Sequence, residues 1–454
     1  MEATTAKITY PKYPAYKDSG VEWLGEIPDH WKLLSNKHIF SLKKELVGKK
    51  SSDYTLLSLT LRGIICRVLE DGGKFPAEFD TYQKVKKGDF VFCLFDVEET
   101  PRCIGLSTFE GMITGAYTVM NVSSEFNRKY LYYFYLNLDA DKRMKPLYTG
   151  LRNTISKDTF FSFKAFIPPL PEQTAIANFL DDKCAKIDRA IAQKEKLIAL
   201  LKERKQIVIQ NAVTGKTVWS EEAQAFVPVA ESGVEVKDSG VEWIGEVPVG
   251  WEVPKLKHIC KFILDGTHGS YPRVESGYRL LSVRNIINGS FKFRNDDSRV
   301  SFKHFKEISS KFLIKSGDIQ LAIVGATLGK VAIVENLPEK VVTQRSLSTI
   351  RVKPNKCSNI YLYYYMQSKL FQSFLWNNTG FSAQPGIYLG TIQNSNLPLP
   401  PYDEQLTIIK HIEFQTTKIN QAITLQQAQI DKLREYKATL IDSAVRGKIK
   451  VVET

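Results

Sequence analysis

The sequence predicts an α+β fold: two globular α+β domains are separated by two long helices that form an antiparallel coiled coil, with an internal pseudo-two-fold repeat. Three observations support this prediction. The segment KDSGVEWLGEIPDHW at 17–31 returns as KDSGVEWIGEVPVGW at 237–251. Further motifs return in the same order behind each copy, which is typical of a duplicated unit. Each copy ends in a proline-free stretch with apolar residues at heptad spacing.

The repeated motifs extend over almost the whole chain. YLYYFYL begins at Tyr130 and YLYYYMQ at Tyr361, and LPEQ at Leu170 is matched by YDEQ at Tyr402. The separation between equivalent residues grows from 220 to 232, so the second copy contains additional residues. The copies agree at their edges and differ in their middles. We expect this pattern when one scaffold carries two different specificities.

Each copy divides into a mixed region and a helical region. Short β-rich runs, turns rich in Gly, Asn and Asp, and one aromatic helix-like segment predict a compact α+β domain. A proline block then precedes an acidic residue, Glu172 in the first copy and Glu404 in the second, which is typical of a helix N-terminus. The predicted boundaries are a first domain at 1–167, a first helix at 168–216, a linker at 217–236, a second domain at 237–397 and a second helix at 398–454.

The helical regions predict a coiled coil. Their apolar residues alternate at spacings of four and three once a few polar positions are included, and polar residues at such positions fix register and partner. We expect antiparallel pairing because the second helix must run back along the first. The alternative is that each helix packs only on its own domain. The predicted seam consists of Ile187, Ile191, Ile198, Leu201 and Val208 in the first helix and of Ile419, Ile423, Ile430, Leu433 and Leu440 in the second.

The composition bounds the class of protein. The net charge of +13 favours a polyanionic partner, of which DNA and RNA are the usual examples. The N-terminus has no apolar signal core, and no stretch of eighteen apolar residues occurs, so we expect a cytoplasmic protein. The six cysteines form no CxxC pair, and no metal site is predicted.

Motifs that would indicate catalysis are incomplete. LPPYD at 399–403 has leucine where an adenine methyltransferase needs Asn or Asp to hold the amino group of the base. GATLGKV at 325–331 lacks both the glycine spacing and the Ser or Thr of a phosphate-binding loop. We therefore expect a chain without catalytic residues. One rival interpretation is a coiled-coil scaffold that joins two proteins. Another is a methyltransferase fused to its own reader, which the incomplete LPPYD motif opposes.

These features together resemble the specificity subunit of type I restriction–modification systems. The resemblance rests on the alternation of variable domain and shared helix, on the repeated VEWLGEIPDHW, and on the helix openings PLPEQTAIANFLD at 169–181 and LPPYDEQLTII at 399–409. It implies a DNA-binding, non-catalytic subunit for DNA methylation and phage defence. Each domain would be a target recognition domain for one half of a bipartite, asymmetric DNA sequence, and the helices would set the spacing.

The resemblance also implies partners and cofactors. Two adenine methyltransferase subunits and two restriction–translocase subunits would assemble on the helices. S-adenosylmethionine, ATP and Mg would be bound by those partners, and no cofactor would be bound by this chain. No membrane partner is expected.

Polar residues in loop-like segments of each domain are the candidates for DNA contact. Reading base edges requires Arg, Lys, Asn or Gln, whereas other basic groups hold phosphates. The first domain has FDVEETPRCIG at 95–105 in place of a GATLGK-like loop, and its carboxylates either accept from cytosine amino groups or face water. The predicted DNA-binding residues are Arg62, Arg102, Arg152, Asn153, Arg284, Asn285, Thr327, Lys330, Gln344, Arg345 and Gln384.

Large apolar residues occur along the repeated opening segment, but their spacing is neither that of a strand nor that of a helix. The first interpretation is that they pack an extended arm against a surface that exists twice. The second is a docking patch for a methyltransferase subunit, since exposed tryptophans mark interfaces. These residues are Val21, Trp23, Ile27 and Trp31 in the first copy and Val241, Trp243, Val247 and Trp251 in the second.

Overall fold

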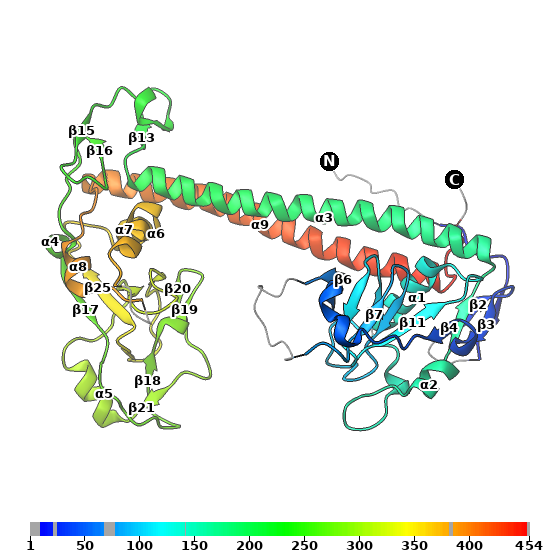
Figure 1. Cartoon of the computed structure of the whole chain (residues 1–454). Coiled ribbons are helices and arrows are strands. Elements are labelled where there is room, and N and C mark those ends of the chain that lie inside the picture. Colours follow the sequence, from blue (N-terminus) through cyan, green and yellow to red (C-terminus); the bar gives the residue numbers. More distant parts are fainter. Residues whose placement is uncertain (1–9, 21–24, 68–77, 141, 381–384, 452–454) are drawn as a thin grey trace. The chain divides into compact units, whose positions relative to one another are not determined.

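The computed structural model describes residues 10–20, 25–67, 78–140, 142–380 and 385–451. The chain divides into two compact units: unit 1 comprises residues 1–194 and 428–454, and unit 2 comprises residues 195–427. Each unit contains one mixed α+β region and part of each long helix (Figure 1). We name the mixed regions head 1 (residues 10–167) and head 2 (residues 236–400).

Head 1 is built on a four-stranded antiparallel sheet. Its strand order is β4 (Phe40–Leu42), β11 (Thr118–Val122), β8 (Phe90–Phe92) and β9 (Ile104–Leu106). Aromatic rings on this sheet pack against helix α1 (Arg128–Ala140), where Tyr135 contacts Phe40 and Phe92 edge-on. Three further antiparallel strand pairs complete the head: β5 (Leu57–Thr60) with β6 (Gly63–Cys66), β7 (Gln83–Val85) with β10 (Gly111–Ile113), and β3 (Lys32–Ser35) with β12 (Lys164–Ile167). The short helix α2 (Lys157–Ser162) precedes β12.

Head 2 contains the same four strands in the same order, followed by two more. The sheet runs β17 (Cys260–Asp265), β25 (Leu347–Val352), β22 (Ile319–Ala322), β23 (Val331–Ile333), β20 (Ser290–Phe291) and β19 (Ile286–Ile287). A second sheet has the order β21 (Arg299–Val300), β18 (Tyr278–Leu281) and β24 (Val342–Thr343), with helix α5 (Phe302–Ser309) beside it. Short helices α4 (Leu256–Ile259) and α8 (Leu389–Asn394) complete the head. The shared order of the first four strands confirms the internal repeat.

The aromatic segment of the second copy differs from the expectation of one helix. It forms α6 (Asn359–Gln367) and α7 (Lys369–Asn377), which are separated at Ser368. The Ser368 side chain accepts a hydrogen bond from the backbone N–H of Phe371 and so caps the second helix. A serine cap that lies between two apolar helices explains why the helical pattern appears continuous in the sequence.

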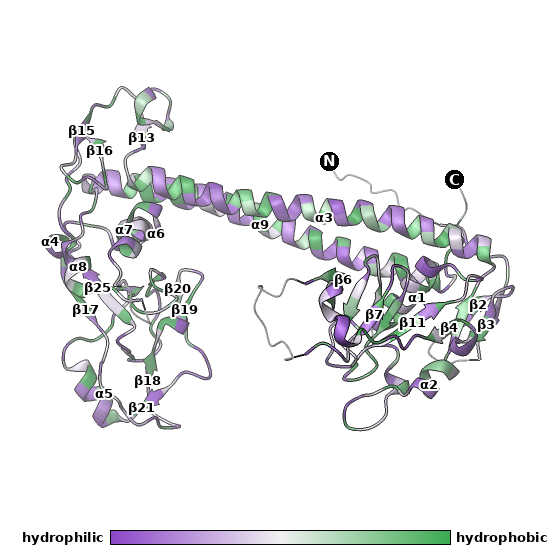
Figure 2. Ribbon diagram, in the orientation of Figure 1, coloured by the Kyte–Doolittle hydropathy of each residue, from purple (hydrophilic) through white to green (hydrophobic). Residues whose placement is uncertain are grey.

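The two long helices are α3 (Leu170–Val213) and α9 (Tyr402–Val445), each of 44 residues. Hydrophobic and hydrophilic residues alternate along both (Figure 2). In unit 1, Lys437 Nζ donates to both carboxylate oxygens of Asp188 at 2.7 Å, and Lys194 Nζ donates to Gln429. As the residue number rises along α3, the residue number of the contacting side chain in α9 falls, so the pairing is antiparallel, as predicted.

The part of the helix pair that belongs to unit 2 continues this register. Lys205 Nζ of α3 donates to Asn420 Oδ1 of α9 at 3.1 Å. The seam therefore carries polar positions that are matched by polar side chains of the facing helix. Such layers favour one register because a shifted register would leave the polar groups without partners.

The predicted seam agrees with the burial of most of its residues. Ile209 is the exception: it is fully buried, whereas the predicted Val208 is half-buried. The last turns of α3 pack into the core of head 2 as well as along α9. Because of this second contact, the buried residue is Ile209 and not its neighbour Val208. The buried seam residues are Ile187, Ile198, Ile419, Ile430 and Leu440, and the half-buried ones are Ile191, Leu201, Val208, Ile423 and Leu433.

The predicted linker at 217–236 contains regular structure. Strands β13 (Thr217–Ser220) and β14 (Ala225–Pro228) form an antiparallel hairpin within unit 2. Phe226 of this hairpin stacks on His411 of α9, with ring centroids 4.0 Å apart, and contacts Trp219 edge-on. The segment is thus anchored to the long helix and is not an open tether.

The repeated opening segment forms a hairpin in both units. The hairpins pair β1 (Tyr16–Asp18) with β2 (Glu26–Pro28) and β15 (Val236–Asp238) with β16 (Glu246–Pro248). The tryptophan behind each hairpin is buried: the Trp31 indole donates to Glu172 at 3.1 Å, and the Trp251 indole donates to Glu404 at 3.0 Å. Each opening segment is therefore fixed to the first turn of a long helix.

The same tryptophans also lie beside the end of the other long helix. A Cβ on Gly447 would lie 2.4 Å from the ring of Pro28, and one on Gly215 would lie 2.4 Å from the ring of Pro248. This confirms packing against the scaffold for Ile27, Trp31, Val247 and Trp251. Trp243 is half-buried and stacks on Phe374, Val241 is half-buried, and Val21 and Trp23 lie outside the described residues.

Candidate nucleic-acid interface

A hollow in unit 1 gathers basic side chains from head 1 and the long helices. Its lining includes Arg62 and Arg102, which the sequence predicted, and Arg143, Arg434 and Lys437, which it did not. Two of these cations are paired within the hollow, Arg143 with Asp442 and Lys437 with Asp188. Arg102 and Arg434 are also in ion pairs, with Asp139 and Asp431. The lining holds five basic and three acidic side chains, and this net positive charge suits a polyanion.

Arg62 stands at the tip of the β5–β6 hairpin. Thr60 Oγ1 accepts a hydrogen bond from the Arg62 backbone N–H at 3.2 Å, and Gly63 has a φ of +92°, which only glycine adopts without strain. The Arg62 side chain is exposed, and the described residues offer it no ion pair. Arg102 is held differently: it lies 3.9 Å from the buried carboxylate of Asp139.

A corresponding hollow in unit 2 brings together three predicted residues, Arg284, Thr327 and Lys330. Gln206 of α3 and Gln372 of α7 also line it. Arg284 is exposed and is oriented by Asp296, at 3.2 Å from its carboxylate, and by Asp297. The hollow thus combines cations with amide side chains, the groups that contact phosphates and base edges.

Arg62 and Arg284 occupy equivalent positions in the repeat. LTLRGII at 59–65 corresponds to LSVRNII at 281–287, with the arginine directly before the glycine or asparagine of a turn. Both side chains line a hollow that also includes a residue of a long helix. This part of the repeat therefore presents an exposed arginine in each unit, at a hairpin tip in head 1 and in the short turn Val283–Asn285 in head 2.

The GATLGK segment forms a tight turn that helix α7 supports. The backbone N–H of Lys330 donates to the Thr327 carbonyl at 3.1 Å, and Gln372 Nε2 donates to the Gly329 carbonyl at 2.8 Å. Gly329 has a φ of +86°, which glycine adopts without strain, and a Cβ there would lie 2.2 Å from Gln372 Oε1. The turn thereby exposes Lys330 at the hollow.

Two further predicted pairs lie outside these hollows. Arg152 is exposed and forms a bidentate ion pair with Asp96, and this hydrogen bonding lowers the pKa of the Asp96 carboxyl. Asn153 donates to Glu99 at 3.0 Å, so the carboxylates of this loop orient the neighbouring basic and amide groups. Arg345 is exposed and Gln344 half-exposed, directly before β25.

Asn285 differs from the other predicted residues that the structure describes in being buried. Asn285 is 0% exposed, and its side chain is bonded to the Ser282 backbone, the Lys292 carbonyl and Asp297. The Asn285 side chain is therefore not available to a base in this conformation, because the amide holds the turn that presents Arg284. Gln384 lies outside the described residues.

Several residues of these surfaces were missed by sequence reasoning. Arg143, Arg434 and Lys437 lie on or beside helices, where a basic residue is usually only solvated. Tyr388 is 81% exposed and lines a hollow with Arg345 and His268. An exposed tyrosine offers an aromatic face to a base, but its exposure has no signature in one sequence. Within the described residues, no group of acidic, cysteine and histidine side chains is arranged to hold a metal ion. None of the described helices is long and apolar enough to cross a membrane.

Comparison with known proteins gives consistent matches. Residues 248–435 match the family model described as type I restriction modification DNA specificity domain. The specificity subunit of type I restriction enzyme MjaVIII from Methanocaldococcus jannaschii is 25% identical over 328 residues, which cover 71% of this chain and 70% of that protein. The EcoBI specificity subunit from Escherichia coli is 24% identical over 298 residues, which cover 62% of this chain and 58% of that protein.

A solved structure shares the fold. A chain from a structure of a type I restriction–modification system, described in terms of complex assembly and conformational transition, superposes with a TM-score of 0.62 at 15% identity. The match covers 93% of this chain and 99% of that chain. The family model over residues 248–435 and the two curated relatives show that this chain is similar to type I restriction–modification specificity subunits, and the solved structure shows that it shares their fold.

Proposed function

We propose that this chain is the DNA sequence-recognition subunit of a type I restriction–modification complex. It is a non-catalytic component, like the specificity subunits to which it is related. The observation that carries the proposal is the matched placement of Arg62 and Arg284, each in a cation-bearing hollow beside a long helix. Arginine reads guanine through two parallel hydrogen bonds in the major groove, so the two positions suit two separate base contacts.

The two heads read different halves of a bipartite, asymmetric target. The support is the divergence of the two heads: head 2 presents the Lys330 turn in the hollow of Arg284, whereas head 1 has a carboxylate-rich loop with Asp96 and Glu99 outside the hollow of Arg62. Lysine and arginine donate to guanine, whereas carboxylates accept from cytosine. The two surfaces therefore favour different bases.

The long helices set the spacing of the half-sites and hold the other subunits. Exposed apolar residues on α9, such as Phe414 and Leu425 at 57% exposure each, support a protein partner on this surface. We assign two adenine methyltransferase subunits and two restriction–translocase subunits to the complex. S-adenosylmethionine, ATP and Mg bind to those partners, and this chain binds no cofactor itself. The complex acts in the cytoplasm, where its DNA substrate lies.

The first test is binding of the assembled complex to duplex DNA as salt is varied. Neutralised phosphates release counterions, so the logarithm of the binding constant is expected to fall linearly with the logarithm of salt concentration. A protein scaffold that joins two other proteins shows no duplex binding even at low salt, and that result would contradict the proposal.

The second test uses the matched arginines. Sites methylated by the assembled complex are mapped by sequencing for Arg62→Ala and for Arg284→Ala. Each variant is expected to relax one half-site by roughly 1–3 kcal/mol of discrimination and to leave the other half unchanged. Arg204→Ala, which removes an exposed arginine of α3 outside both hollows, is the control and should leave both halves intact. Relaxation of both halves by one variant would exclude separate reading.

A further inference from the structure

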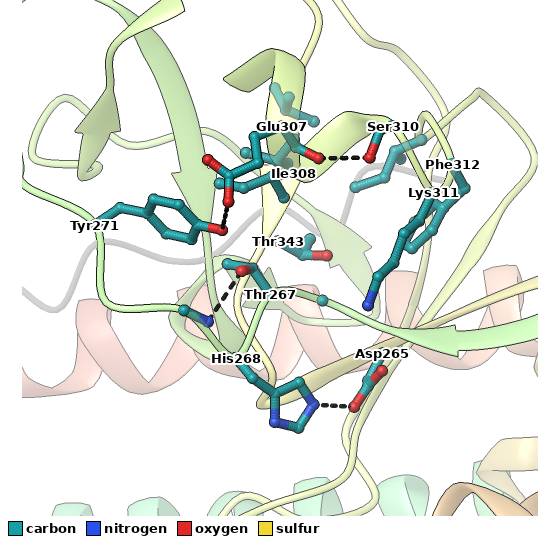
Figure 3. A pocket seen from close by; sticks show the side chains of 15 residues that line it. Asp265, Thr267, His268, Tyr271, Glu307, Ile308, Ser310, Lys311, Phe312 and Thr343 are labelled. Atoms are coloured by element: carbon teal, nitrogen blue, oxygen red, sulfur yellow. Dashed lines mark hydrogen bonds and ion pairs between the residues drawn. The ribbon is translucent and has the colours of Figure 1, made fainter. Parts of the chain in front are cut away.

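A cavity in head 2 lies beside the DNA-contact candidates without belonging to their hollow. It has a volume of about 330 Å³, at the small end of the range for ligand pockets. Its walls come from the loop after β17, from helix α5 and from strand β24 (Figure 3). A Cβ on Gly266 would lie 2.3 Å from the Thr343 carbonyl, so this loop lies against the strand as only glycine permits.

A threonine in the cavity wall carries a buried hydroxyl group that has no partner among the described residues. Thr343 is 2% exposed and lines the cavity, yet its Oγ1 has no hydrogen-bond partner within the described part of the chain. Its backbone carbonyl is already used, because it accepts from Thr267 N at 2.8 Å. Buried hydroxyls are normally paired, so this group is suited to a molecule that enters the cavity.

The lining combines apolar faces with both donors and acceptors. Ile308, Ile314 and Phe312 give one apolar wall. Glu307 accepts from the Tyr271 hydroxyl at 3.0 Å, which leaves its second carboxylate oxygen with acceptor capacity. Figure 3 shows Thr343 and the ammonium end of Lys311 between the Tyr271–Glu307 pair and the His268–Asp265 pair. The carboxylates disfavour an anion inside, and the polar groups disfavour a wholly apolar ligand.

We propose that this cavity is a nucleobase pocket that takes one planar base. A base offers apolar faces and an edge of alternating donors and acceptors, which match the wall and the Thr343, Glu307 and Lys311 groups. Asp265 and His268 also line the neighbouring hollow that holds Arg345 and Tyr388. The pocket therefore adjoins the surface assigned to DNA, and an extruded base of the target is its source. This DNA source rests on the proposed function, whereas the chemistry of the pocket does not.

The test uses two variants of the full-length chain. Thr343→Val keeps the shape of the side chain and removes only the unpartnered hydroxyl, so the fold should be retained. Ser346→Ala is the matched control, because it removes a second hydroxyl that has no partner among the described residues and lies outside the cavity lining. Thermal unfolding of both variants verifies that each is folded.

In the first arm, the target sequence is mapped for the assembled complex, and 2-aminopurine is placed at each position of the half-site read by head 2. We expect a severalfold rise in fluorescence at one position with the wild type and with Ser346→Ala, and loss of that rise with Thr343→Val. A position that responds equally with Thr343→Val reports a base extruded by another subunit.

In the second arm, adenosine, cytidine, guanosine or thymidine is added to the chain, and the unfolding temperature is measured. A rise for the wild type that is absent for Thr343→Val supports the pocket with a free nucleoside as its source, even if no 2-aminopurine position responds. If neither arm shows a response that depends on Thr343, the inference is overturned. If the complex binds no duplex at all, the proposed function fails, and the nucleoside arm still decides the pocket.

Discussion

The glutamate and the glutamine of the shared EQ motif make the same kinds of hydrogen bond in both units. Glu172 and Glu404 accept the indole N–H of a tryptophan from the opening hairpin. Gln173 and Gln405 each accept from a backbone N–H of their own head and donate to a carbonyl of the proline block, at 2.9 to 3.0 Å. These bonds fix the first helical turn to the head. EQ therefore occurs twice because the same contact between a head and the first turn of a long helix occurs twice. The repetition does not indicate a repeated catalytic site.

The glycines that end the long helices give a residue-level prediction. Gly215→Ala would place a methyl group 2.4 Å from the Pro248 ring at a φ of +73°. Gly233→Ala is the matched control, since its φ is +71° and nothing lies within 4 Å. We expect the control to cost roughly 1–2 kcal/mol for the left-handed conformation and Gly215→Ala to cost about 1–3 kcal/mol more for the overpacking. Urea unfolding measures both, and equal losses would show that this junction is loosely packed.

Asp442 gives a prediction about pH. Burial alone would raise the pKa of its carboxyl, but hydrogen bonds from Lys448 and Arg143 outweigh burial and lower the pKa to about 2. A depressed pKa in the folded state stabilises the protein above the unfolded value of about 3.9, and this stability is lost as the pH falls towards about 2. Asp442→Asn should therefore reduce the free energy of unfolding by on the order of 1–2 kcal/mol at neutral pH.

The difference between wild type and Asp442→Asn should narrow as unfolding is repeated at decreasing pH. The sign follows because the wild-type carboxylate becomes protonated and loses its ion pairs, whereas the amide has no charge to lose. A difference that stays constant, or that widens in acid, would contradict the assigned ion pairs.

At this scale the sequence indicates residue types better than residue roles. Arg284 and Asn285 are adjacent polar residues in one turn, and both were predicted to contact DNA. The structure exposes the arginine and buries the asparagine as the support of the turn. Which of two neighbours faces outward depends on strand pairing and on Asp297, which lies farther along the chain, so no local pattern could separate them.

At the scale of elements, the helix pair is held in register by polar contacts as well as by apolar burial. Lys437 with Asp188 in unit 1 and Lys205 with Asn420 in unit 2 join the facing helices. Heptad spacing could be predicted because it is local to each helix. The burial of Ile209 in place of Val208 could not be predicted, because it arises where α3 also packs into head 2.

The Lys437–Asp188 pair can be measured by a double-mutant cycle with Lys437→Ala and Asp188→Ala. Both side chains are partly exposed, so we expect a coupling of about 0.2–1 kcal/mol. The coupling should decrease at high salt, because screening weakens exposed pairs. A coupling near zero at low salt would mean that this contact does not help to fix the register.

Two elements escaped prediction for reasons of length. The hairpin at 217–228 has strands of four residues each, and a polar turn of similar length separates them, so it reads as a linker. The break at Ser368 is one residue wide and lies within an aromatic run. Short elements are specified by contacts from elsewhere, here His411 and the core of head 2, more than by their own composition.

At the scale of the whole molecule, the duplication carried the prediction of the fold. Matched motifs predicted two heads and two helices, and the shared order of four strands in both heads confirms the repeat. The hollows could not be predicted in the same way, because they form where loops from the divergent middles meet the shared helices. The two heads and the two long helices can therefore be predicted from one sequence, whereas the surface proposed to contact DNA can be located only once the fold is known.

The central claim is that the helices set the gap between two half-sites that separate heads read. Its most direct test inserts seven residues into both helices, after Leu201 in α3 and after Ile423 in α9. The observed register between Lys205 and Asn420 places these two points opposite each other. Seven residues preserve the heptad seam and lengthen each helix by roughly 10 Å at about 1.5 Å per residue. The turn added by seven residues falls about 20° short of whole helical turns, so the heads rotate only slightly.

The measurement is the sequence methylated by the complex that contains the doubly extended chain, mapped by sequencing. We predict that both half-sequences are retained while the gap between them grows by about two to four base pairs, since each base pair spans about 3.4 Å along the duplex. An insertion in one helix alone should misalign the seam and weaken binding to every target. If the doubly extended chain instead directs methylation at the original gap as efficiently as the parent, the helices do not set the spacing and the account is contradicted.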